Sequence, residues 1–137
     1  MKLTKEVLAE EYAGYDEATA LSLEGKGLTQ LRDIGLCAGV EYLSIRFNSL
    51  ASLREVSNCR HLWILDAQQN RLRDLDGLSA LTALGTVVLT GNDLPLSALR
   101  PLETVVIIHL EASLAKGSRK EVMRTLPGMC QAGTVDL

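Results

Sequence analysis

Apolar residues recur along the chain in a pattern that repeats every 22 residues. Three segments, starting at residues 40, 62 and 84, place apolar side chains at their first, fourth, sixth and eleventh positions and an asparagine at the ninth. These asparagines are Asn48, Asn70 and Asn92. Before each asparagine, apolar residues alternate with other residues, which predicts a short β-strand with one buried face. The polar stretch around the asparagine predicts a bend.

The second half of each repeat has apolar residues at every third position, a spacing that predicts a 3₁₀-like return segment. They form three columns, which contain Leu31, Leu53 and Leu75, then Ile34, Val56 and Leu78, then Cys37, Cys59 and Leu81. A degenerate repeat starts at residue 18, with Lys26 at the asparagine position. After Leu84 the pattern returns 18 residues later at Leu102. This predicts a short return segment and a fifth strand with Val105 and Ile107 buried.

A repeat of this size cannot bury its own apolar face, so the units are expected to stack into a solenoid with one continuous leucine core. Each asparagine is expected to bond backbone groups at its bend, which predicts a ladder along the stack.

The 22-residue unit LxxLxLxxNxLxxLxxLxxL resembles the leucine-rich repeat superfamily, specifically its 22-residue intracellular class, over residues 18–114. The resemblance implies an α/β fold, a right-handed solenoid or horseshoe segment. About five parallel strands would line its concave side, with 3₁₀ or irregular segments on the convex side and helical caps at both ends. Residues 110–129 resemble a C-terminal cap of that family. The chain is then one domain, with residues 1–17 as N-terminal cap and 115–137 as C-terminal cap.

The N-terminal cap has its own sequence signals. Thr4 is placed to cap a helix that begins at Lys5, and Leu3 and Leu8 have the spacing of a hydrophobic staple. Val7, Leu8 and Tyr12 would form the buried stripe. At the other end, residues 119–126 are predicted to form a helix, which the following Pro-Gly pair ends.

Charge and composition exclude several classes of function. The net charge is -3 over 137 residues, without the basic cluster that grips phosphate backbones, so direct nucleic-acid binding is not expected. No apolar run reaches the roughly 20 residues that cross a bilayer, and the N-terminus has no apolar signal core. We therefore expect no membrane association, a cytoplasmic protein with a nuclear or ciliary location as alternatives, and a monomer.

Residues that could carry catalysis are few and scattered. His61 and His109 lie in different repeats, too far apart to share a metal. Cys37 and Cys59 share a core column with a leucine, so we expect buried reduced thiols. Cys130 leaves a small hydrolase open as a minor alternative. The sequence predicts a non-enzymatic protein with no metal and no cofactor.

The surface that can vary without harming the core is formed by the outward positions of the strands, here called the concave face. They are Ala20, Ser22, Glu24, Tyr42, Ser44, Arg46, Ile64, Asp66, Gln68, Thr86, Val88, Thr90, Thr104, Val106 and Ile108. Aromatic residues beside arginine are typical of binding hot spots. The predicted partner-binding residues are Tyr42, Ser44, Arg46, Phe47, Trp63, Ile64, Asp66, Gln68, Val88, Thr90, Val106 and Ile108. Alternatively, Phe47 and Trp63 pack on the solenoid flank.

The resemblance implies an adaptor that binds a protein partner on its concave face, with a ciliary or cytoskeletal role favoured. The alternative is a ribonucleoprotein or nuclear regulatory subunit that resembles the spliceosomal A-prime protein or the acidic nuclear phosphoproteins. Those phosphoproteins carry a long acidic tail, which this sequence lacks.

Overall fold

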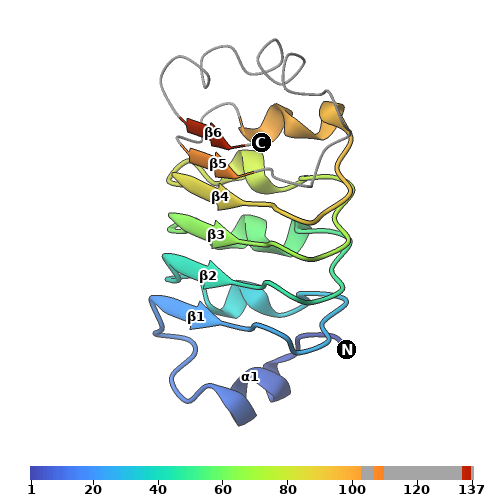
Figure 1. Ribbon diagram of the computed structural model, residues 1–137. Coiled ribbons are helices and arrows are strands. Elements are labelled where there is room, and N and C mark those ends of the chain that lie inside the picture. Colours follow the sequence, from blue (N-terminus) through green and yellow to red (C-terminus); the bar gives the residue numbers. More distant parts are fainter. Residues whose placement is uncertain (103–106, 110–133, 137) are drawn as a thin grey trace.

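Short parallel strands, stacked in sequence order, organise the chain (Figure 1). A computed structural model describes residues 1–102, 107–109 and 134–136. Among these residues one sheet contains β1 (Ala20–Ser22), β2 (Tyr42–Ser44), β3 (Ile64–Asp66), β4 (Thr86–Val88), β5 (Ile107–His109) and β6 (Thr134–Asp136). Tyr42 pairs with Ala20 on one side and Ile64 on the other, and Ile64 pairs with Thr86. The predicted 22-residue register is confirmed over these four strands.

The return segments are 3₁₀-helices, as the spacing of three predicted. They are η1 (Ile34–Leu36), η2 (Arg54–Asn58), η3 (Leu78–Ala80) and η4 (Leu96–Leu102). They lie across the stack from the strands (Figure 1), and apolar side chains from both halves of each repeat fill the space between them. Leu43, Leu65 and Val87 from the strands and Cys37 and Cys59 from the return segments are all fully buried.

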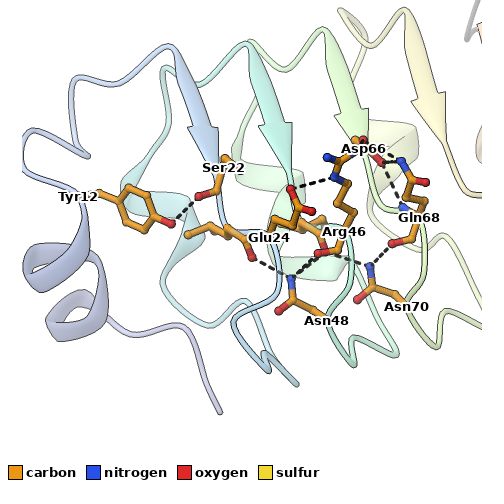
Figure 2. A network of polar contacts seen from close by, with 10 residues as sticks. Tyr12, Ser22, Glu24, Arg46, Asn48, Asp66, Gln68 and Asn70 are labelled. Carbon is orange, nitrogen blue, oxygen red and sulfur yellow. Dashed lines mark hydrogen bonds and ion pairs between the residues drawn. The ribbon is translucent and has the colours of Figure 1, made fainter.

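The asparagine ladder is present. The Asn48 side-chain oxygen accepts hydrogen bonds from the backbone N–H groups of Lys26 and Leu28, both at 3.0 Å. Its amide nitrogen donates to the carbonyl oxygens of Leu23 and Ile45, both at 2.9 Å (Figure 2). Each bond to Lys26, Leu28 or Leu23 joins repeat 2 to repeat 1, where repeats 1 to 4 start at residues 18, 40, 62 and 84.

The same arrangement recurs one and two repeats later. Asn70 accepts from the Leu50 N–H at 3.1 Å, and Asn92 accepts from the Leu72 N–H at 3.1 Å. Both donate to carbonyl oxygens of their own repeat and of the preceding one. All three asparagines are buried, so their amides replace the water that the bends would otherwise need.

A helix, α1 (Lys5–Glu11), begins at Lys5 as predicted. The Thr4 hydroxyl accepts from the Val7 N–H at 3.4 Å, and Leu3 and Leu8 are fully buried against repeat 1. Val7 and Tyr12 are only partly buried. The Tyr12 hydroxyl donates to the Ser22 carbonyl (Figure 2), which joins the end of α1 to the first strand.

The predicted register of the fifth strand is wrong. In the structure Ile108, not Val105 or Ile107, pairs with the buried Val87, so the fourth unit spans 21 residues instead of 18. Leu102 ends η4, which is not short. Residues 105–108 are all aliphatic, so alternation could not fix the register, and a one-residue slip exchanges the two faces. β6 was not expected, and the helix predicted at 119–126 lies outside the described residues.

The buried thiols give a pH prediction. Burial, with a smaller contribution from Cys37, raises the pKa of Cys59 to about 11. The unfolded thiol titrates near 8.5, so above that pH the unfolded chain releases a proton that the folded chain keeps. The free energy of unfolding should therefore fall as the pH rises from about 9 to 11, by at most about 1.4 kcal/mol per pH unit.

We expect urea unfolding to show a steeper loss of stability over this pH range for the wild-type protein than for Cys59→Ala. The variant is less stable at neutral pH because it leaves a cavity, so the slopes are compared and not the absolute values. Equal slopes would mean that the Cys59 thiol is accessible in the folded protein.

Candidate functional site

The concave face is not uniformly open. Tyr42 is 39% exposed, but Ser44 and Asp66 are only 3% and 9% exposed. The expectation that both point freely to solvent is wrong, because parallel strands lie about 4.8 Å apart and larger neighbours shield short side chains between them. Ser44 Oγ is buried and finds no hydrogen-bond partner among the described residues. These two residues can shape the surface, but they offer a partner little contact area.

Polar side chains of three neighbouring repeats form a connected row at the ends of the strands (Figure 2). Arg46 Nε lies 3.0 Å from the carboxylate of Glu24, and its Nη1 lies 3.8 Å from that of Asp66. Gln68 Nε2 donates to both carboxylate oxygens of Asp66, at 3.0 and 3.1 Å. One cation is thus shared by two anions, which leaves this row with one net negative charge.

The hydrogen bond to Glu24 raises the pKa of Arg46, and the charges of Glu24 and Asp66 add to the effect against some desolvation. The guanidinium therefore stays charged at any working pH. The ion pair with Glu24 is exposed, and such pairs stabilise a fold little, so its main effect is to hold the Arg46 side chain across the strands.

Phe47 has an unfavourable backbone conformation for its side chain. Its φ is +58°, and the equivalent residues of repeats 1, 3 and 4 are also left-handed, namely Gly25, Gln69 and Gly91. Phe47 is 51% exposed, and the Arg46 guanidinium lies over its ring at 5.9 Å from the centroid. A glycine would satisfy this bend better, so neither the backbone nor the core accounts for a phenylalanine here.

This gives a prediction that separates the ring from the backbone. Phe47→Gly and Phe47→Ala both remove the ring, but only glycine relieves the left-handed strain. We expect Phe47→Gly to be more stable than Phe47→Ala by about 1 kcal/mol in urea unfolding. If Phe47 contacts a partner, both variants should lose the same affinity. If the affinity for the partner instead differs between the two variants in the same order as their stability, Phe47 is a structural residue.

Trp63 lies at the opposite end of the strands from Phe47, just before β3, and is 59% exposed. Because an extended chain rises about 3.3 Å per residue, Tyr42 and Phe47 lie roughly 16 Å apart along β2 and its continuation. The three aromatic residues belong to two neighbouring repeats, as expected, but they form two separate groups. Tyr42 and Trp63 are at one edge of the concave face and Phe47 is at the other.

The remaining predicted residues are less exposed or fall elsewhere. Ile64, Gln68, Val88 and Thr90 are half-buried on the concave face. Ile108 is in register with the core column of Val87, so its assignment to the concave face is wrong, and Val106 lies outside the described residues.

Two contacts of the site were missed in the sequence. Glu24, which was placed on the concave face but not in the binding set, forms an ion pair with Arg46 of the next repeat, and Gly85 contacts Trp63 from the following repeat. Both lie 22 residues from the residue they contact, so comparing neighbouring repeats column by column would have found them.

Over the described residues, no three His, Cys, Asp or Glu side chains gather closely enough to hold a metal ion. Within the same ranges, no helix has the length and apolar character needed to cross a bilayer.

Comparison with solved structures identifies the fold. The chain superposes on the Drosophila melanogaster SNF/U2A′ complex with a TM-score of 0.75 and 25% identity, over 93% of this chain and 80% of the other. Two Listeria monocytogenes internalins, InlC2 and InlF, give TM-scores of 0.69 and 0.68 with 19% and 18% identity. These matches cover 85% and 80% of this chain.

The chain spans half the length of internalin C2 and about a third of internalin F. No protein-family model matches it, and no curated protein does. The superpositions nevertheless show that the stack of strands and return segments is shared with these solved neighbours. The chain therefore has the leucine-rich repeat fold.

Proposed function

We propose that the chain is a non-enzymatic adaptor that binds a protein partner on its concave face. The observation that supports this most directly is the exposure of Tyr42, Phe47 and Trp63, which lie on two adjacent repeats at the two edges of the concave face. Exposed aromatic side chains are costly in water, and aromatic residues with arginine are enriched at interface hot spots. The left-handed Phe47 strengthens the argument because it disfavours the folded chain itself.

The site of contact is proposed to centre on Tyr42, Arg46, Phe47 and Trp63. Ile64, Gln68, Val88 and Thr90 would surround it as half-buried contacts, and Ser44 and Asp66 would support Arg46 from below. The partner would add no cofactor or metal to this surface. A monomeric adaptor in the cytoplasm remains our prediction for the free protein.

A second candidate is a ribonucleoprotein subunit that holds an RNA-binding protein. The similarity to the SNF/U2A′ complex favours it, because that match covers most of both chains. A ciliary or cytoskeletal adaptor stays a prediction from the resemblance, and none of the solved neighbours described above favours it.

Affinity purification with mass spectrometry distinguishes these candidates. The purified chain is used as bait, with and without ribonuclease, and a variant of the concave face serves as control. An adaptor outside ribonucleoproteins should recover the same partner in both conditions, without RNA. Recovery of RNA together with an RNA-binding protein, where the protein stays bound after ribonuclease, would favour the second candidate. Partners recovered equally by bait and control would contradict both.

A further inference from the structure

Trp63 is the only tryptophan of the chain, and a glycine of the next repeat makes room for its ring. An ideal Cβ placed on Gly85 would lie 2.8 Å from Nε1 and 2.9 Å from Cδ1 of the Trp63 indole. Any side chain at position 85 would therefore displace the indole. The ring leans towards repeat 4, and the side chain is still 59% exposed.

Glu41 lies on the other side of Trp63 in the stack. The Trp63 N–H donates to the Glu41 carbonyl at 2.8 Å, and the Gly85 N–H donates to the Trp63 carbonyl at 2.8 Å. Glu41, Trp63 and Gly85 are thus equivalent residues of three successive repeats. The Glu41 side chain is exposed, and none of the described residues forms an ion pair with it. The exposed Glu41 thus occupies the equivalent position of the neighbouring repeat, on the side of Trp63 away from Gly85 in the stack.

We propose that Trp63 and Glu41 form a site for one basic side chain, a lysine or an arginine, of the protein partner. Gly85 acts as a positioning residue for the indole. This inference rests on the proposed function, and it names the chemistry of one partner residue. A cation over an indole face is attracted by the ring quadrupole, and tryptophan is the best ring for this contact. The carboxylate supplies the opposite charge.

An apolar partner residue fits this site less well. It would cover the Glu41 carboxylate without offering it a hydrogen bond, which is costly for a charged group. Arg60 and His61 precede Trp63 in the chain, but neither forms an ion pair or ring contact with Trp63 or Glu41. The site is therefore not already filled by a cation among the described residues.

The fluorescence of the single tryptophan reports on this site directly. The probe is a ten-residue peptide of alternating arginine and glycine, and the matched control is the same peptide with citrulline, which keeps the shape and removes the charge. We expect the arginine peptide to change the Trp63 emission saturably, and the citrulline peptide to bind at least threefold more weakly. Glu41→Gln should weaken the arginine peptide by a similar factor.

Gly85→Ala tests the positioning role, because it shifts the indole without removing it. We expect it to weaken the arginine peptide, whereas Gly39→Ala, which meets nothing within 4 Å, should leave it unchanged. Circular dichroism shows whether Gly85→Ala folds, and Glu41→Gln keeps the test decisive if it does not. Equal binding of both peptides, no saturable change, or no effect of Glu41→Gln would overturn the site.

Failure of this site and failure of the proposed function give different results. If substitutions of Tyr42 and Arg46 abolish partner capture while the arginine peptide does not bind, only the basic-residue site is wrong. If the arginine peptide binds as expected while those substitutions leave capture intact, the concave-face proposal is wrong.

Discussion

We expect Asn48→Ala to destabilise the protein more than Asn70→Ala, by about 3 against about 2 kcal/mol in urea unfolding. Removing the Asn70 amide takes from the buried Leu50 N–H the one acceptor it has within the described part of the chain. The carbonyl oxygens that Asn70 binds keep others, since Asn48 still donates to Ile45 and Asn92 to Ala67. Truncating Asn70 thus leaves one buried donor unpaired.

Asn48 satisfies more groups that have no second partner. Its removal leaves the Leu28 N–H and the Leu23 carbonyl unpaired in the core, as well as the partly buried Lys26 N–H. The matched control is Lys26→Ala, at the asparagine position of repeat 1, whose side chain forms only an exposed ion pair with Glu11. Unfolding free energies that are equal for Asn48→Ala and Lys26→Ala would contradict the ladder as a source of stability.

The sequence predicted the regular part of the fold because each repeat presents the same columns. Leu43, Leu65 and Val87 align at a constant spacing, and the polar positions between them fix which face is buried. The predicted register was wrong where apolar and polar positions no longer alternate, over the aliphatic run that contains Ile107 and Ile108. β6 was missed because Thr134–Asp136 is too short to show a period of its own.

The site was predicted less completely than the fold. Successive residues of a strand point to opposite faces, so the sequence shows which positions point outward. This placed Tyr42 and Arg46 correctly on the surface. How far neighbours cover a short side chain depends on rotamers and ion pairs across strands, so the burial of Asp66 could not be read from its own strand. The left-handed backbone at Phe47 was also hidden, because two of the four equivalent residues are not glycine.

The second large effect is expected for binding. Tyr42→Ala combined with Arg46→Gln should weaken the partner at least about thirtyfold and leave the melting temperature within about 3 °C. Neither side chain belongs to the core between repeats, so both substitutions remove contact area without a cavity. Glutamine is chosen for Arg46 because a glutamate there would place a third carboxylate beside Glu24 and Asp66.

A matched control lies on the opposite side of the solenoid. Leu36→Ala with Arg54→Gln also removes one exposed apolar and one cationic side chain, since Leu36 is 45% exposed in η1 and Arg54 is exposed in η2. This control variant tests whether any loss of surface area and positive charge weakens binding.

The most direct test of the central claim is the dissociation constant of the purified partner, measured by calorimetry for the wild-type protein and for both double variants. A concave-face partner should bind Tyr42→Ala/Arg46→Gln at least about thirtyfold more weakly and Leu36→Ala/Arg54→Gln with wild-type affinity. Wild-type affinity for the concave variant, or an equal loss for the convex control, would contradict binding on the concave face.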